Sequence, residues 1–227
     1  MTMKHKRKLI SLMLAFTLIL AMPVQSFAHE DTVTTVSSSS EELSHSDVYI
    51  FNGPDGLTYV GYEISNNFSY DIYVGLTVQY RDRDYNNVGE TSAYIPSVAP
   101  GEAAFIFAPD YYDTQDYYNY STLFYGDSGY ESATWGLSQI QTEQSGNQLT
   151  FSTHNNTYDV IYAPIITVVY WQDAMPVAAY SGTVSNSSGN DYIISKQDGS
   201  VTFTVPDIEY DQCLYYVTAY FFEGGIE

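Results

Sequence analysis

The chain has 227 residues, of which 27 are acidic and seven are basic, so its formal net charge is −20. Beyond position 28 the only basic residues are Arg81, Arg83 and Lys196, whereas all the acidic residues lie there. A surface this acidic repels nucleic acid, anionic lipid and anionic polymers, which disfavours all three as partners.

The first 28 residues have the pattern of a secretory signal peptide. A basic start at residues 4–8 precedes an uncharged apolar run at residues 9–22, and small residues occupy Ser26 and Ala28. This pattern predicts cleavage before His29, and the apolar run is short for a membrane span. We therefore expect a mature chain without a transmembrane segment, secreted or held non-covalently at the cell surface.

Cys213 is the single cysteine, so the mature chain has no internal disulfide and its stability depends on the core. It stands in an apolar run, residues 213–217, where we expect a buried and inert thiol. An exported chain without disulfides fits a bacterial source.

After a polar tether at residues 29–46, short apolar or alternating runs recur between turn signals such as Asn52-Gly53-Pro54-Asp55-Gly56. No long helical periodicity is present, and the nearest candidate, residues 131–141, reads equally well as a strand. The predicted strands cover residues 48–51, 58–64, 72–80, 103–107, 117–125, 149–152, 160–170, 176–184, 192–195, 201–205 and 213–222.

The two halves resemble one another. Residues 66–73 align with 155–162 after a one-residue gap, and residues 76–80 align with 166–170. Residues 105–110 match 201–207, and a tyrosine-rich strand follows in both halves. This order predicts an all-β chain of two tandem immunoglobulin-like antiparallel β-sandwich modules, residues 47–130 and 131–227, that arose by internal duplication.

The first module resembles the FxLYD-type extracellular β-sandwich family of bacteria. The resemblance is carried by Asn67, residues 70–80, the Pro100-Gly101-Glu102 turn and residues 105–107. The second module has Asp198-Gly199-Ser200 at the turn position. These motifs are turns and core positions, so the resemblance implies a fold and an extracellular location but no catalytic residue.

Catalytic motifs are weak. Gly126-Asp127-Ser128-Gly129 is similar to the nucleophile segment of trypsin-like peptidases, whose serine needs a histidine base. Beyond the leader the histidines are His29, His45 and His154, and the first two lie in the tether. We interpret the segment as a turn, find no spacing for a zinc site, and expect a protein that is not an enzyme.

Calcium is the one cofactor that the pattern suggests. Residues 82–87 begin like an EF-hand loop, but Asn87 and Ala93 replace the expected glycine and glutamate. Acidic groups also follow Pro109 and Pro206, the equivalent prolines of the two modules. These candidate calcium ligands are Asp110, Asp113, Asp116, Asp207, Glu209 and Asp211. A solvated acidic surface is the favoured interpretation.

All 24 tyrosines lie beyond residue 28, and their rings can pack across strands or bind sugars and proteins. The candidate ligand-binding residues are Trp135, Trp171, Tyr111, Tyr117 and Tyr215. The leading hypothesis is a non-enzymatic extracellular binding or adhesion protein with a protein or cell-surface glycan partner. The alternatives are a carbohydrate-binding or glycan-acting protein and a calcium-stabilised structural protein.

Overall fold

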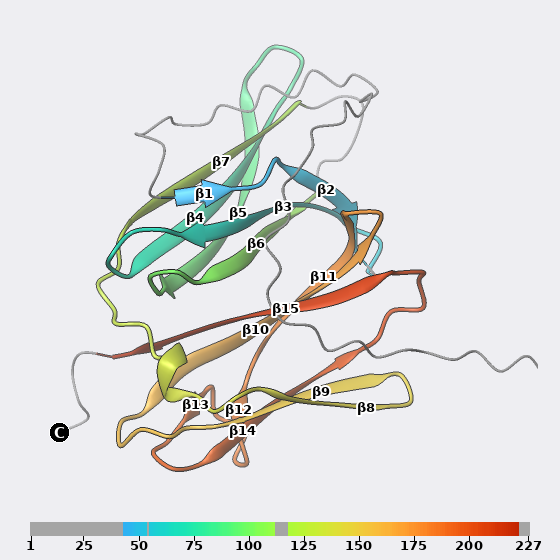
Figure 1. Cartoon of the computed structure of the whole chain (residues 1–227). Coiled ribbons are helices and arrows are strands. Elements are labelled where there is room, and N and C mark those ends of the chain that lie inside the picture. The colour runs from blue at the N-terminus through green and yellow to red at the C-terminus, as the bar shows by residue number, and fades with distance from the viewer. Residues whose placement is uncertain (1–42, 54, 112–117, 223–227) are drawn as a thin grey trace, which may run out of the picture. The chain divides into compact units, whose positions relative to one another are not determined.

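Antiparallel strands form four sheets in the computed structural model, which describes residues 43–53, 55–111 and 118–222 (Figure 1). Sheet I has the order β5-β4-β7, with β4 (Ile72–Arg81), β5 (Asn87–Val98) and β7 (Tyr118–Asp127). In sheet II, β3 (Thr58–Asn66) pairs with each of the other three strands, which are β1 (Leu43–His45), β2 (Tyr49–Asn52) and β6 (Ala103–Asp110).

The second half of the chain supplies the other two sheets. In sheet III, β10 (Ile161–Gln172) pairs with the other three strands, which are β11 (Met175–Thr183), β13 (Tyr192–Ile193) and β15 (Gln212–Phe221). Sheet IV has the order β12-β14-β9-β8: β8 (Gln141–Ser145), β9 (Gln148–His154), β12 (Ser185–Asn186) and β14 (Asp198–Thr204). One 3₁₀ turn, η1 (Thr134–Gly136), links the two halves. The predicted all-β sandwich architecture is confirmed.

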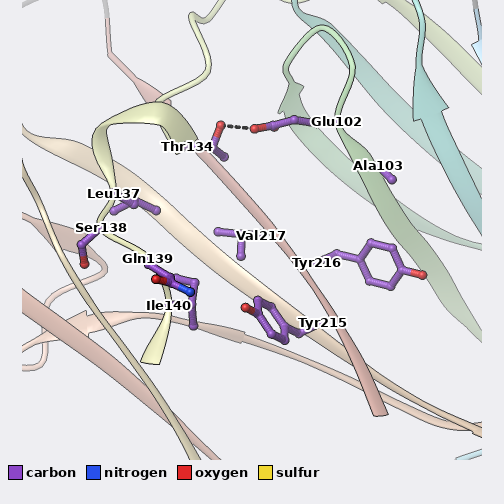
Figure 2. Close-up of a pocket in the computed structure, with 10 residues that line it drawn as sticks. All are labelled: Glu102, Ala103, Thr134, Leu137, Ser138, Gln139, Ile140, Tyr215, Tyr216 and Val217. Carbon is purple, nitrogen blue, oxygen red and sulfur yellow. Dashed lines mark hydrogen bonds between the residues drawn. The ribbon is translucent and has the colours of Figure 1, made fainter. Parts of the chain in front are cut away.

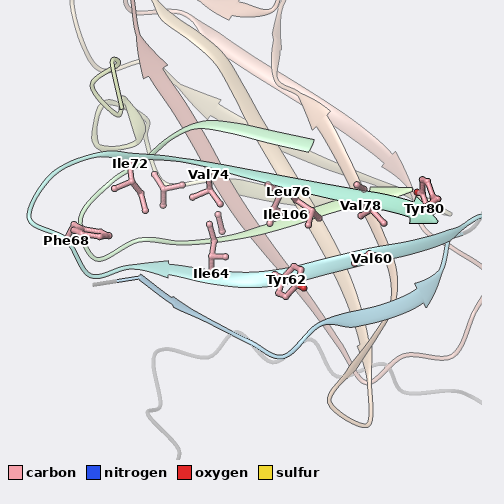
Figure 3. Close-up of a cluster of buried hydrophobic side chains, with 13 residues drawn as sticks. Val60, Tyr62, Ile64, Phe68, Ile72, Val74, Leu76, Val78, Tyr80 and Ile106 are labelled. Atoms are coloured by element: carbon pink, nitrogen blue, oxygen red, sulfur yellow. The ribbon is translucent and has the colours of Figure 1, made fainter. Parts of the chain in front are cut away.

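Strict alternation along β4 builds the first core. Successive side chains of a strand point to opposite faces, so Ile72, Val74, Leu76, Val78 and Tyr80 share one face and are fully buried. They pack against the inward residues of β3 and β6 (Figure 3). Sheets I and II therefore form one sandwich.

The second core lies between sheets III and IV. Ile166, Val168 and Tyr170 of β10 pack on Phe151 of β9 and Phe203 of β14. The strands pair as in the first sandwich, because β9–β14 corresponds to β3–β6 and β10 takes two long neighbours as β4 does.

The two sandwiches pack against each other through a third apolar layer. Phe51 and Phe105 on the outer face of sheet II contact Val169, Trp171 and Tyr216 on the outer face of sheet III. Strand β10 is consequently buried on both faces, which explains why its sequence is almost continuously apolar.

One buried asparagine ties the corresponding turn of each sandwich. The Asn66 amide Nδ2 donates to the carbonyl oxygens of Tyr70 and Val98 at 2.9 and 2.8 Å. Its Oδ1 accepts the Phe68 N–H at 2.9 Å. Asn155 repeats the arrangement, donating from Nδ2 to the Asp159 carbonyl at 2.8 Å. Both asparagines are fully buried, and each stands at the position that the internal alignment pairs.

Some elements differ from the prediction. Residues 43–45, assigned to the tether, pair with β3, so the sandwich begins earlier than expected. Strand β5 was not predicted, and residues 131–141 contain η1 rather than one regular element. The described residues belong to one compact unit. None of their helices is long and apolar enough to cross a membrane.

Candidate functional site

A pocket of about 550 Å³ opens where the two sandwiches meet, between the start of β6, the segment from η1 to β8, and β15 (Figure 2). Its volume is in the range of small-molecule sites. We call it the junction pocket, and its lining residues are Glu102, Ala103, Thr134, Leu137, Ser138, Gln139, Ile140, Tyr215, Tyr216 and Val217.

Glu102 forms the wall contributed by the first sandwich. The preceding Gly101 has a φ of +76°, a value that favours glycine, and its N–H donates to the Asn66 carbonyl at 2.7 Å. This turn aims Glu102 at η1, where its Oε1 accepts the Thr134 hydroxyl at 2.5 Å. Its Oε2 lies 3.4 Å from the Ala99 N–H. Glu102 thus bridges the first sandwich to the connecting segment.

The opposite wall presents an aromatic ring and an amide. Tyr215 is 43% exposed, and its ring packs edge-on against Phe151 with a centroid separation of 5.3 Å, which restricts its orientation. The Gln139 side chain is exposed beside it (Figure 2). A ring face and an amide together can stack on a ligand and exchange hydrogen bonds with it.

Tyr216 closes the pocket toward the third apolar layer. Its hydroxyl donates to Glu63 Oε1 at 2.8 Å, which makes a second polar bridge between the sandwiches. Burial, followed by the nearby Glu63 carboxylate, raises the pKa of Tyr216 far above its ordinary value. The phenol therefore remains a hydrogen-bond donor at neutral pH.

The two tryptophans lie in different environments. Trp135 is 68% exposed on η1, with its ring 5.6 Å from that of Phe221. Trp171 is only 8% exposed, and it packs edge-on against Tyr49 and Phe105 in the third apolar layer. Trp171, a candidate for a recognition face, is therefore buried between the sandwiches, as the alternative of aromatic packing between modules has it.

The candidate tyrosines do not gather either. Tyr111 is 61% exposed after β6, whereas Tyr117 lies outside the described residues. Of the four aromatic candidates that the structure describes, only Tyr215 lines the junction pocket. The polar residues Glu102, Thr134 and Gln139 line the same pocket but lie far from Tyr215 in the sequence, and no local motif marks the four as a group.

The acidic candidates that the structure describes do not form a cluster. Asp110 is buried at the end of β6, and Asp113 and Asp116 lie outside the described residues. In the second loop, the Asp211 carboxylate accepts the Asp173 N–H at 3.0 Å. Asp207, Glu209 and Asp211 are exposed. Within the described part of the chain, no group of three or more acidic, histidine or cysteine residues gathers in a way that could hold a metal ion.

The loop at residues 82–87 closes on itself. Asp82 Oδ1 accepts the N–H groups of Asp84 and Asn86, both at 2.9 Å, and the Asn86 side chain also donates to this carboxylate. These hydrogen bonds, with Asn86 as the largest contributor, lower the pKa of Asp82. The carboxylate acts as the organiser of a tight turn.

Ser128 and Cys213, two side chains of reactive types, lie in surroundings that do not activate them. Ser128 donates to the carbonyl oxygens of Pro96 and Tyr130, each at 2.8 Å, and so fixes the turn after β7. Cys213 is exposed, contrary to the expected burial. Its thiol nevertheless lies beside Tyr170 among enough protein atoms that desolvation raises its pKa to about 11, which makes the reactive thiolate scarce.

Comparisons with known proteins add little to this geometry. No family model matches the chain, and no curated protein matches it in sequence. The structure of red sea bream transglutaminase is similar with a TM-score of 0.26 and 13% identity, over 81% of this chain and 29% of that chain. We draw no conclusion from a similarity of this size.

Proposed function

We propose that this chain is an exported, non-enzymatic binding protein that acts at a cell surface or in the extracellular space, with the junction pocket as its ligand site. The signal-peptide pattern in residues 1–28 supports export. The observation that carries the binding role is the exposed Tyr215 ring beside the Gln139 amide at the boundary of the two sandwiches. Ligand sites occur preferentially at boundaries of this kind.

The chemistry of the pocket argues against glycoside hydrolysis. A glycosidase needs two carboxyl groups that flank the scissile bond. Within the described part of the chain, Glu102 is the only acidic residue that lines the junction pocket, and Thr134 already engages its carboxylate. A protein segment or a cell-surface glycan can bind there without being cleaved.

Loss of the Tyr215 ring tests the proposal. Labelled Tyr215→Ala protein should bind the surface of the producing cells about tenfold more weakly than the unchanged chain, as expected for removal of an aromatic anchor. Tyr158→Ala is the matched control, because Tyr158 is 86% exposed and does not line the pocket. Equal binding by both variants would refute a role for the pocket.

We also propose that the two sandwiches are copies of one ancestral extracellular module, in keeping with the FxLYD-type resemblance. The support is the shared strand pairing and the repeated asparagine at positions 66 and 155. In both turns the asparagine Nδ2 also reaches a carbonyl on a distant strand, that of Val98 or Ile193. Two sandwiches that were similar only by chance would have no reason to share this hydrogen bond.

A further inference from the structure

A second cavity lies between the sandwiches, separate in its lining from the junction pocket except at Tyr216. It has a volume of about 200 Å³ and is bounded by β5 and β6 on one wall and by β10, β11 and β15 on the other. We call it the hydroxyl cleft, because its polar lining includes the hydroxyl groups of Thr167, Ser181 and Thr218. The first two lie 2.7 Å apart as a hydrogen-bonded pair.

Among the residues that the structure describes, none that lines the hydroxyl cleft carries a formal charge at neutral pH. This is notable in a chain with a net charge of −20. The remaining wall is apolar and includes Ile95, Phe107 and Ile165. A ligand in the cleft therefore meets hydroxyl groups and hydrocarbon but no ion.

The hydroxyl cleft continues into exposed rings on the outer face of sheet I. Tyr94 lines the cleft and is 55% exposed. The Tyr73 ring is 5.8 Å from that of Tyr94, and Phe124, which is 43% exposed, lies 6.4 Å from Tyr73. We call Tyr94, Tyr73 and Phe124 the aromatic row.

Two glycines fix the position of these rings. The Phe124 ring leans over Gly75, so that a Cβ at that position would collide with it. The Tyr73 ring covers Gly126 in the same way, with its Cε1 2.7 Å from where a Cβ would stand. Glycine weakens the interior of a strand. Here the missing side chain leaves room for the rings to lie against the sheet.

We propose that the hydroxyl cleft and the aromatic row together bind a neutral polysaccharide chain. The C–H faces of sugar rings match the exposed rings, and sugar hydroxyls match the threonine and serine hydroxyls, each of which can donate and accept. The acidic surface repels anionic polymers, so the uncharged cleft selects a neutral one. This inference rests on the proposed role as an extracellular binding protein but uses a surface other than the junction pocket.

The test is affinity electrophoresis of the full exported chain in gels that contain hydroxyethyl cellulose, dextran or soluble starch, with anionic carboxymethyl cellulose as the comparison polymer. We expect retardation by at least one neutral polymer and weaker retardation by the anionic one. Tyr94→Ala and Phe124→Ala should each weaken the affinity about tenfold. Tyr94→Phe, which keeps the ring, should preserve most of the binding.

Two further variants separate this site from the junction pocket. Tyr158→Ala should be retarded like the unchanged chain, Tyr215→Ala tests whether the junction pocket takes part, and urea unfolding checks that each variant is folded. If none of the neutral polymers retards the chain, the inference is overturned, whereas the cell-binding test of Tyr215 is unaffected. Loss of retardation in Tyr215→Ala but not in Tyr94→Ala would also overturn it and assign the polymer to the junction pocket. Dimerisation that Tyr94→Ala abolishes, without polymer retardation, would overturn it in favour of a second copy.

Discussion

Replacing either buried asparagine by alanine should destabilise the fold strongly. In Asn66→Ala, the carbonyl oxygens of Tyr70 and Val98 and the N–H of Phe68 lose their side-chain partner. Each lost hydrogen bond costs about 1 kcal/mol, and more where the remaining group stays buried. We therefore expect the free energy of unfolding to fall by about 3 kcal/mol, a substantial part of the 5–15 kcal/mol typical of domains.

Asn155→Ala should cost a similar amount, because Asn155 bonds the carbonyl oxygens of Asp159 and Ile193 and the N–H of Thr157. The assay is urea unfolding followed by tryptophan fluorescence, to which Trp171 contributes from the apolar layer between the sandwiches.

The chain offers a matched control beside each buried asparagine. Asn67 and Asn156 are exposed, and Asn67 makes only a 3.3 Å side-chain hydrogen bond to Ser44. Alanine at either position should change the free energy of unfolding by less than about 0.5 kcal/mol. If Asn66→Ala and Asn155→Ala cost no more than these controls, the asparagines do not hold the turns and the reasoning is refuted.

Three other measurements follow from the structure. Trp171→Ala should lower the free energy of unfolding by about 3–5 kcal/mol, because it empties the layer between the sandwiches; a loss below 1 kcal/mol in urea unfolding would contradict this. Burial, and then Asp55, raise the pKa of Tyr59 from 10.0 to about 12. Protonated Tyr59 contributes fully to stability below about pH 10, and this contribution is lost as the pH rises toward 12. The urea midpoint should therefore fall across this interval, and it should fall less in Tyr59→Phe. Millimolar calcium or chelator should leave the melting temperature unchanged, and a shift would point to the acidic loops.

Alternation and turn signals were enough to predict most strands, because one face of most of them is largely apolar. Strand β5 was missed since it is an edge strand whose exposed face carries Glu90, Ser92 and Tyr94 and whose inward face is only partly buried. The sequence analysis left the packing of the sandwiches open, although β10 contained a signal. Its run from Ile165 to Trp171 is apolar on both faces except at Thr167, which is typical of a strand that is covered on two sides.

The junction pocket and the hydroxyl cleft could not be predicted in the same way. Both arise at the contact between sandwiches, so their walls combine residues such as Tyr94 and Ser181 that are far apart in the chain. Sequence reasoning found Tyr215 only as one of many tyrosines. What it lacked was the relative placement of the two modules, which depends on side chains such as Phe105 and Trp171 meeting across the third apolar layer.

The identity of a few side chains determines which sheet faces pack. Val169 and Trp171 of sheet III are covered by sheet II, whereas the aligned positions of sheet I carry Gln79 and Arg81. The Arg81 guanidinium lies 4.8 Å from the centre of the Tyr120 ring and keeps that end of sheet I polar. At these two positions the outer face of sheet I is thus polar where the outer face of sheet III is apolar and covered.

The aromatic row lies at the other end of sheet I. Phe124 aligns with Thr218, which borders the hydroxyl cleft rather than the apolar layer that joins the sandwiches. The exposed rings therefore do not correspond to the surface by which the second sandwich packs on the first. Packing of another sandwich on sheet I in the mode that joins the observed two would not cover Tyr94 and Phe124. Their exposed rings are therefore accessible to the neutral polysaccharide that we propose as the ligand.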